Sequence, residues 1–464
     1  GLGTGSGVSL DAHVLLITVT ISVATGVAFG LVPALRASRV DLETALKAGA
    51  GEHGTDGRYN LRGLLVVSEV ALALMLLVGA ALLIRSFVAL RQVNPGFEPH
   101  NVLTMQTVIV GRHFSAAAPV RELGNGGLER LSVLPGVESA AASLTGVPLD
   151  TCCALNVGIL GRPRDDELTY AVYWNLISPG YFDVLKIPLV RGRTFTERDD
   201  AGATPVVLIN QAMAKRYWPD ADPLRDSLLV APRIGGELEE TVPRRIVGVV
   251  GDVRYYQLRN EPRASIYVPL TQVSERQVAF VNRLAPTMTW LIRTRGEPRV
   301  LADAIQREVR TAGGGLRPVA ISTMDDVSGA STSRDRFEMS LVTIFGAVAL
   351  LLAAVGLYGV MSYSVQTRRR EIGIRLALGA ESRQLRRMVL AQAMAMTCAG
   401  IAVGLAGALA LTRFMASLLF GVGPYDRDSF VIVPLVLSVV ALAAAWIPAR
   451  RASTLDPIAA FRAE

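Results

Sequence analysis

The chain has few residues of the kinds that bind metal ions or form disulfides. Its 464 residues include only three cysteines and four histidines. Cys152 and Cys153 are adjacent, and a bridge between neighbours is strained, while Cys398 lies inside an apolar run. The histidines are scattered along the chain and form no ligand cluster. These features exclude a disulfide framework, and we expect no metal site.

Motifs for nucleotide binding and catalysis are also missing from the sequence. No G-x-x-x-x-G-K-[ST] pattern occurs, so we expect no ATP hydrolysis by this chain. No G-x-S-x-G, H-E-x-x-H or paired-cysteine motif occurs either, and we predict no catalytic residue. The formal charge of +7 is small for this length, and the basic residues gather beside apolar runs. This pattern argues against nucleic acid as a partner and in favour of a membrane surface.

Long apolar runs are the dominant feature that is present. A bilayer core of about 30 Å requires roughly 20 mainly apolar residues in a helix. Buried helices of a large soluble protein are the alternative, but such helices seldom run this long without a charge. We therefore predict membrane-spanning helices at Val14–Leu35, Leu64–Ile84, Leu341–Tyr363, Met388–Leu411 and Phe430–Ile447.

Basic residues flank these runs unevenly. They follow the first, third and fifth runs and precede the second and fourth, for example at Arg368–Arg370 and Arg450–Arg451. The short loop on the opposite side has only Arg413 and Arg427. By the positive-inside rule the basic side is the cytoplasm, so the long segment from Ser86 to Phe337 is expected to be extracytoplasmic.

That long segment has the pattern of a mixed α/β domain. Its strand candidates are short, β-branched and bounded by glycine, proline or aspartate; they are Val137–Ser143, Thr204–Ile209, Arg245–Val253, Ser265–Leu270, Met288–Thr294 and Pro318–Ile321. Its helix candidates are Val120–Leu134, Gln211–Trp218 and Val300–Thr311. A further helix is expected after Ser178-Pro179, with serine as the cap. The predicted fold is a membrane α-helical bundle with an inserted extracytoplasmic mixed α/β domain.

One stretch of the sequence occurs twice. The residues from Pro33 read PALRASRVDLETALKA, and those from Pro448 read PARRASTLDPIAAFRA. The first run is therefore expected to be a second copy of the fifth, and the chain the C-terminal part of a fused two-unit protein. The expected divisions are the last span of a preceding unit, a linker, a first span, the outer domain and a three-span region, at residues 1–47, 48–60, 61–85, 86–337 and 338–464.

The most distinctive local pattern lies between the third and fourth runs, where the chain reads TRRREIGIRLALGAESRQLRRM from Thr367. Glu371 and Arg375 have the i, i+4 spacing of a helical ion pair, and Gly379-Ala380 is typical of a helix end. We predict a short amphipathic helix on the cytoplasmic surface. Its apolar face needs a docking protein or the membrane interface. A basic flank that contacts lipid headgroups is the simpler alternative.

Two polar residues fall inside predicted spans. Glu69 lies about one turn inside the second run, and Gln392 has a similar position in the fourth. A carboxylate at this depth is costly and indicates a role, either as a structural contact or in a proton relay. The nearby cytoplasmic flank favours the structural contact for Glu69. Gly26-x-x-x-Gly30 and Gly400-x-x-x-Gly404 would permit close helix packing.

Taken together, these motifs resemble a known family. The loop RRREIGIRLALGA, the outer loop SLLFGVGPYD and the tail PARRAS resemble the FtsX-like permeases of the MacB type, which are membrane subunits of mechanotransmitting ABC transporters. The stretch VVSEVALALMLLVGAALLIRSF looks like the first span of that family, and YWNLISPGYFDVLKIPLVRGRTF looks like part of its periplasmic domain. The copied span at the start is similar to the double-length branch, in which two permease units are fused.

The resemblance implies a permease driven by a separate ABC ATPase, which would hold ATP and Mg²⁺, with no cofactor in this chain. It implies location in the bacterial inner membrane, with the large domain in the periplasm. Further implied partners are the lipid bilayer, the upstream permease half and a periplasmic adaptor or outer-membrane channel. The implied ATPase-docking residues are Arg368, Arg369, Arg370, Glu371, Ile372, Ile374, Arg375, Leu378, Gly379 and Ala380.

Two other functions are consistent with spans and an outer domain. One is a membrane receptor or sensor with an extracytoplasmic ligand-binding domain, and the other is a membrane enzyme. The first would need a cytoplasmic signalling module and the second clustered catalytic residues, and the sequence has neither. We therefore expect a permease for export, efflux or mechanotransmission. The sequence does not identify the substrate, which could be a drug, a peptide or a lipoprotein, and members of the family can also transport nothing.

Overall fold

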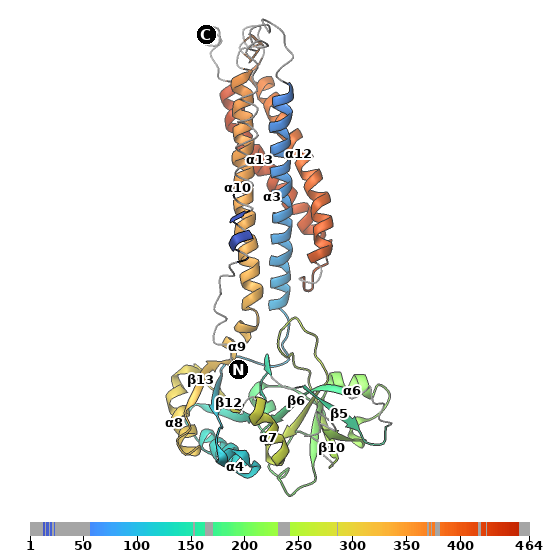
Figure 1. Ribbon diagram of the computed structural model, residues 1–464, viewed down its shortest axis with the longest axis vertical. Coiled ribbons are helices and arrows are strands. Elements are labelled where there is room, and N and C mark those ends of the chain that lie inside the picture. The colour runs from blue at the N-terminus through green and yellow to red at the C-terminus, as the bar shows by residue number, and fades with distance from the viewer. Residues whose placement is uncertain are drawn as a thin grey trace. The chain divides into compact units, whose positions relative to one another are not determined.

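Two compact units make up the computed structural model, which is shown in Figure 1. One unit contains the residues up to Leu77, Gly346–Ala410 and the residues from Phe430 onward, and the other contains Val78–Phe345 and Leu411–Ser429. The residues that the structure describes are 13, 15–17, 19–20, 23, 56–151, 154–162, 170–230, 242–284, 286–368, 371–372, 374–375, 381–415, 419–423 and 425–453.

Four helices in the described ranges are long and apolar enough to cross a membrane (Figure 1). They are α3 (Asp56–Arg91), α10 (Ser333–Thr367), α12 (Ser382–Met415) and α13 (Arg427–Ser453). Even the shortest, with 27 residues, is about 40 Å long at the rise of an α-helix. These helices confirm the four predicted spans from Leu64 onward. The predicted span Val14–Leu35 and the linker at 48–60 lie mostly outside the described residues.

In the first unit, small residues of α12 let α3 approach closely. A Cβ atom on Gly404 would lie 2.9 Å from the carbonyl oxygen of Ala71, and one on Gly400 would lie 2.6 Å from Cγ1 of Val70. Neither position has room for a side chain without movement of a neighbour. The pair Gly400 and Gly404 therefore forms a packing face toward α3, as the sequence predicts. The similar pair at Gly26 lies outside the described residues.

The second unit is built on an 11-stranded sheet. Its strands are β1 (Val102–Val108), β2 (Val137–Ser143), β5 (Ala154–Ile159), β6 (Tyr170–Ile177), β7 (Leu189–Gly192), β8 (Val206–Asn210), β9 (Ser227–Val230), β10 (Arg244–Val250), β11 (Ser265–Pro269), β12 (Thr287–Thr294) and β13 (Pro318–Thr323). A separate two-stranded sheet pairs β3 (Gly146–Val147) with β4 (Asp150–Thr151). The helices of this unit are α4 (Ala117–Ser132), α5 (Tyr181–Leu185), α6 (Gln211–Tyr217), α7 (Glu275–Leu284), α8 (Ala302–Ala312) and α9 (Met324–Ser331). Four short 3-10 helices are η1 (Arg112–Ser115), η2 (Pro223–Arg225), η3 (Leu270–Gln272) and η4 (Pro298–Leu301).

Strand pairing divides the large sheet into two lobes. Six strands form a closed circuit in the order β11-β8-β10-β9-β5-β6, because β6 also pairs with β11. The other lobe is the antiparallel run β2-β12-β1-β13. A single residue pair, Ser143 with Ile177, joins the lobes between β2 and β6. The β8–β10 and β6–β11 pairs are parallel, so the domain is mixed α/β, as predicted.

The apolar core lies on both faces of the sheet. Side chains alternate between faces along a strand, so Trp174 of β6 joins one cluster and Tyr173 joins the other. The first cluster is centred on Trp174 and Trp290, and the second contains Tyr181 and Tyr267. Burial raises the pKa of both Tyr181 and Tyr267 well above the ordinary value, so these hydroxyls stay neutral.

Glycine in α4 allows this helix to lie close to the sheet. Helices α4 and α8 lie side by side on the lobe that contains β12 (Figure 1). A Cβ atom on Gly127 would overlap the ring of Trp290, and one on Gly124 would lie 2.8 Å from Cδ2 of Leu270. Glycine costs a helix about 1 kcal/mol relative to alanine. Packing of the helix directly on Trp290 offsets that cost.

The predicted strands match the observed ones to within a few residues, and β2 matches at both ends. The predicted serine cap at Ser178 is wrong. Helix α5 begins after Gly180, and no side chain caps it. Ser178 is buried, and its Oγ atom accepts a hydrogen bond from the amide of Ala142 at 2.9 Å. Its side chain is therefore used to hold the end of β6 against β2.

Candidate functional site

In the part that the structure describes, the predicted docking segment begins with a turn at Arg368 and is helical after it. Residues 371–372 and 374–375 are helical, and the Ile372 amide donates to the Arg368 carbonyl at 2.9 Å. The Glu371 and Arg375 side chains form an ion pair of 2.6 Å, which confirms the predicted i, i+4 contact. The remaining candidates lie outside the described residues; they are Arg369, Arg370, Leu378, Gly379 and Ala380.

The two isoleucines of this segment have opposite environments. Ile372 is 2% exposed, whereas Ile374 is 41% exposed. Besides its ion pair with Glu371, Arg375 contacts α12: its Nη1 atom lies 3.2 Å from the sulfur of Met388. Ile372 and Arg375 therefore fix the segment to its own unit. Ile374 and the carboxylate of Glu371 form an exposed face, which we call the docking face.

Hydrogen bonds also join the helix ends on this side of the first unit. The Ser382 hydroxyl at the start of α12 donates to the carbonyl of Ser453 at the end of α13, at 3.1 Å. Nη1 of Arg451 donates to the hydroxyl of Tyr358 in α10, also at 3.1 Å. The segment with the docking face contacts α12 through Arg375 and Met388, and the start of α12 is bonded in turn to the end of α13.

The two intramembrane polar residues have different surroundings. Glu69 of α3 lies against Gly356 of α10, where an added Cβ atom would overlap its carboxylate. Gly356 thus makes room for the carboxylate where the two helices meet. Gln392 is half-buried on α12. The roles predicted for Glu69 and Gln392 remain predictions.

The second unit, which contains the outer domain, has a polar cluster near the ends of its long helices. Nη1 of Arg85, near the end of α3, lies 2.7 Å from Asp426 and 2.8 Å from Asp428 at the start of α13. The amide of Phe420, in the loop between α12 and α13, donates to the Ser86 hydroxyl at 2.8 Å. The Phe420 ring packs against the apolar cluster that contains Tyr181 and Tyr267. We call these five residues, Arg85, Ser86, Phe420, Asp426 and Asp428, the outer junction.

Two arginines hold the segment that follows α3 and the first turn of α10 to the outer domain. Arg293 of β12 is 3% exposed and donates to the carbonyls of Glu98, His100 and Val184 at 2.7 to 2.8 Å. Burial lowers the pKa of Arg293, and the three carbonyls supply the hydrogen bonds that a buried guanidinium requires. Arg259 pairs with Asp335 in the first turn of α10 at 2.7 Å. The chain is therefore held where it enters the domain and where it leaves.

The outer junction is not among the predicted sites, although the sequence contains one signal for it. Arg85 directly follows the second apolar run on the side where the positive-inside rule disfavours arginine. Such a residue indicates a nearby partner, and here the partners are two aspartates more than 300 positions away.

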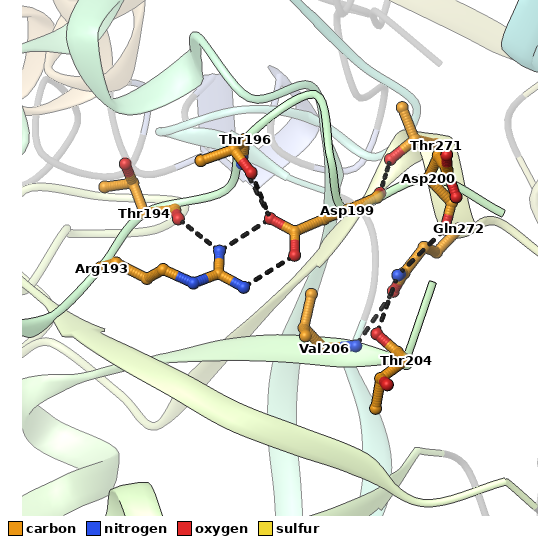
Figure 2. Close-up of polar contacts among 9 residues, drawn as sticks. All are labelled: Arg193, Thr194, Thr196, Asp199, Asp200, Thr204, Val206, Thr271 and Gln272. Atoms are coloured by element: carbon orange, nitrogen blue, oxygen red, sulfur yellow. Dashed lines mark hydrogen bonds and ion pairs between the residues drawn. The ribbon is translucent and has the colours of Figure 1, made fainter. Parts of the chain in front are cut away.

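Figure 2 shows a polar network that holds the segment after β7 against η3. Arg193 donates two hydrogen bonds to Asp199, at 2.7 and 2.8 Å, and the Thr196 amide adds a third at 2.8 Å. Gln272 accepts from the Val206 amide and donates to the carbonyls of Thr204 and Asp200, while Thr271 donates to the Asp199 carbonyl.

This network fixes a loop and offers no group for catalysis. Burial of the Asp199 carboxylate favours the protonated form, but the hydrogen bonds from Arg193 and Thr196 outweigh it and lower the pKa of Asp199. The carboxylate is therefore charged and fully engaged. Within the described ranges, no group of three or more His, Cys, Asp or Glu residues could hold a metal ion.

These features define a class: a multi-pass membrane protein whose helical bundle is interrupted in sequence by a large mixed α/β domain. The family model of the MacB-like periplasmic core domain matches residues 65–312, more than half of the chain. The FtsX-like permease C-terminal model matches residues 343–457. The chain belongs to the MacB-type family of ABC transporter permeases.

Curated relatives have modest sequence identity to this chain. The macrolide export ATP-binding/permease protein MacB of Acinetobacter baylyi is 24% identical over 306 residues, which cover 65% of this chain and 44% of that protein. A probable export ATP-binding/permease protein of Pseudomonas fluorescens is 23% identical over 394 residues, covering 78% and 57%. The chain spans about half the length of these curated relatives. The crystal structure of the periplasmic region of MacB from Actinobacillus actinomycetemcomitans covers 52% of this chain and 97% of its own, with 16% identity and a TM-score of 0.33.

Proposed function

We propose that this permease couples ATP hydrolysis by a separate ABC ATPase subunit to movement of its periplasmic domain, in an export or mechanotransmission complex of the bacterial inner membrane. The names of the relatives join ATP binding and permease functions. The 464 residues of this chain contain no P-loop. ATP and Mg²⁺ would therefore bind to the partner ATPase, and this chain would need a surface that receives its motion.

The docking face is the observation that carries this proposal. An exposed isoleucine beside an ion-paired carboxylate, on helical residues, suits insertion into a groove of a protein partner. The buried Ile372 anchors the segment to its unit. The amide of Arg368 donates to the carbonyl of Ser364 at 3.2 Å, which continues the hydrogen bonding from the end of α10 toward the segment. A displacement of the docking face would therefore be passed to α10.

Further parts of the proposal follow from the family. Relatives named for macrolide and pyoverdine export favour efflux of a small molecule. A preceding permease half, which the repeated sequence near Pro33 predicts, would complete a pair of units within one chain. A periplasmic adaptor or an outer-membrane channel would receive an exported substrate.

Charge reversal on the docking face tests the proposal. The tagged chain is expressed in its host with Glu371→Lys and Ile374→Asp, and the copurified ATPase subunit and its activity are measured. A buried charge in place of a central anchor residue costs about 2 kcal/mol or more in an interface, or roughly 30-fold in affinity. We expect loss of both the bound ATPase and its stimulation.

The matched control is Glu308→Lys on α8, which reverses one charge of an exposed ion pair with Arg130 in the outer domain. This control should retain the ATPase. Unchanged ATPase recovery and activity in the docking-face variant would refute the docking claim and favour the receptor alternative.

A further inference from the structure

A groove of about 690 Å³ lies between α12 and α13 in the first unit. It is separate from the docking face and from Glu69. Its lining residues are Glu381, Arg383, Gln384, Arg386, Arg387, Leu390, Ala391, Met394 and Trp446. All except Trp446 come from the first turns of α12 or the residue before it.

The α12 side of the groove changes from basic to apolar along one helix face. Arg383, Arg386 and Arg387 are spaced i, i+3 and i+4, so they share a face. Leu390 and Met394 continue that face by one and two further turns. Within the described ranges none of these three arginines forms an ion pair. Arg386 makes one 3.4 Å hydrogen bond to the carbonyl of Ser382.

The charged side chains at one end of the groove have a net positive charge. Glu381 opposes the three arginines, which leaves two net positive charges at its cytoplasmic end. Guanidinium groups match phosphate oxygens in shape and charge. The opposite wall carries Trp446, which is 49% exposed and about two turns before the end of α13. Tryptophan is typical of the boundary between headgroups and acyl chains.

The depth of the groove selects the kind of ligand. From Arg383 to Met394 the face runs for about 16 Å along α12, from the polar end of the helix into its apolar span. A soluble protein could contact the arginines but could not reach the apolar part within a bilayer. A molecule with a phosphate head and a hydrocarbon tail matches both parts.

We propose that this groove binds an anionic phospholipid, with its phosphate on Arg383, Arg386 and Arg387 and an acyl chain along Leu390, Met394 and Trp446. The site requires only that α12 and α13 cross a bilayer, and it is independent of ATPase docking. Bound lipid would fill the gap between the two helices and stabilise their packing near the cytoplasmic surface.

Trp446 supplies the test, because it is the only one of the four tryptophans that lies in a predicted span. Trp174, Trp218 and Trp290 are buried in the outer domain. The full chain is reconstituted in phosphatidylcholine vesicles that contain either brominated phosphatidylglycerol or brominated phosphatidylcholine. Brominated chains quench tryptophan on contact. We expect a preference for phosphatidylglycerol of roughly 25-fold, from about fivefold for each net positive charge.

Two variants separate the groove from general surface charge. The triple change Arg383→Gln, Arg386→Gln and Arg387→Gln should remove the preference. Ala391→Phe keeps every charge, fills the groove and should also remove it. The control is Arg334→Gln, Arg413→Gln and Arg427→Gln, which removes the same charge from the other ends of the helices and should leave the preference intact.

Three results would overturn the proposal. The first is equal quenching by both brominated lipids in the unaltered chain. The second is a preference that survives Ala391→Phe, since the arginines would then act as a flat charged surface. The third is loss of the copurified ATPase from the arginine triple variant with no change in lipid preference, which would assign the groove to a protein contact.

Discussion

Alanine in place of Gly127 should destabilise the outer domain, whereas alanine in place of Gly126 should stabilise it. Both glycines lie in α4, but a Cβ atom on Gly127 would overlap Trp290, and one on Gly126 would have no neighbour within 4 Å. Alanine gains about 1 kcal/mol over glycine in a helix. Overpacking of a core site costs about 1–3 kcal/mol.

The upper end of that cost applies at Gly127, because Trp290 cannot easily move. Its ring is fully buried, and Nε1 donates to the hydroxyl of Thr107 at 3.1 Å. We therefore expect a net loss of about 2 kcal/mol for Gly127→Ala and a gain of up to about 1 kcal/mol for Gly126→Ala.

Thermal unfolding followed by tryptophan fluorescence measures both changes, because Trp174, Trp218 and Trp290 lie in this domain. For a domain of this size 1 kcal/mol corresponds to about 2–4 °C in Tm. Gly126→Ala should raise Tm by up to that amount, and Gly127→Ala should lower it by about twice as much. A Tm for Gly127→Ala at or above that of the unaltered chain would refute the argument that α4 needs glycine for close packing.

Three further changes test other contacts. Asp199→Asn should lower Tm at pH 7. Because the pKa of Asp199 is lowered in the folded state, the carboxylate stabilises the fold above about pH 3.9, and this stabilisation is lost as the pH falls below that value. Plots of Tm against pH for the variant and the unaltered chain should therefore converge in acid rather than stay parallel. Gly404→Ile should weaken the packing of α12 on α3 and reduce thermal stability in detergent, whereas Gly359→Ile on an open face of α10 should not. Ser86→Ala removes the acceptor of the Phe420 amide, and that amide should exchange hydrogen roughly fivefold faster; an unchanged rate would show that the hydrogen bond does not hold the loop.

The sequence was sufficient to predict the elements whose signals are local. The four described spans depend on apolar length, and the Glu371–Arg375 pair depends on helical spacing. The predicted strands depend on β-branched runs bounded by turn residues. Helix α7 also has a local signal, because Ser274 and Gln277 form the reciprocal hydrogen bonds of a capping box.

The rest of the fold depends on contacts that are distant in sequence. Strand β7 is exposed at all four residues, so it has no alternation that could identify it. The closed circuit of six strands requires β6 to pair with β11, about 90 residues later in the chain, as in Trp174 with Ile266. The outer junction joins Arg85 to Asp426 across 341 positions. Spacing rules cannot predict such pairs, because they describe neighbours along the chain.

The outer junction changes the mechanical freedom of the outer domain. A body attached at two points can still rotate about the line between them. Along the described chain the outer domain is connected at two points, where α3 ends at Arg91 and where α10 begins at Ser333. Phe420 adds a third attachment, because its ring packs against the apolar cluster of the domain while its amide is held by Ser86. A third attachment that does not lie on that line removes this rotation, so the outer domain is constrained by the loop between α12 and α13 as well as by its two chain connections.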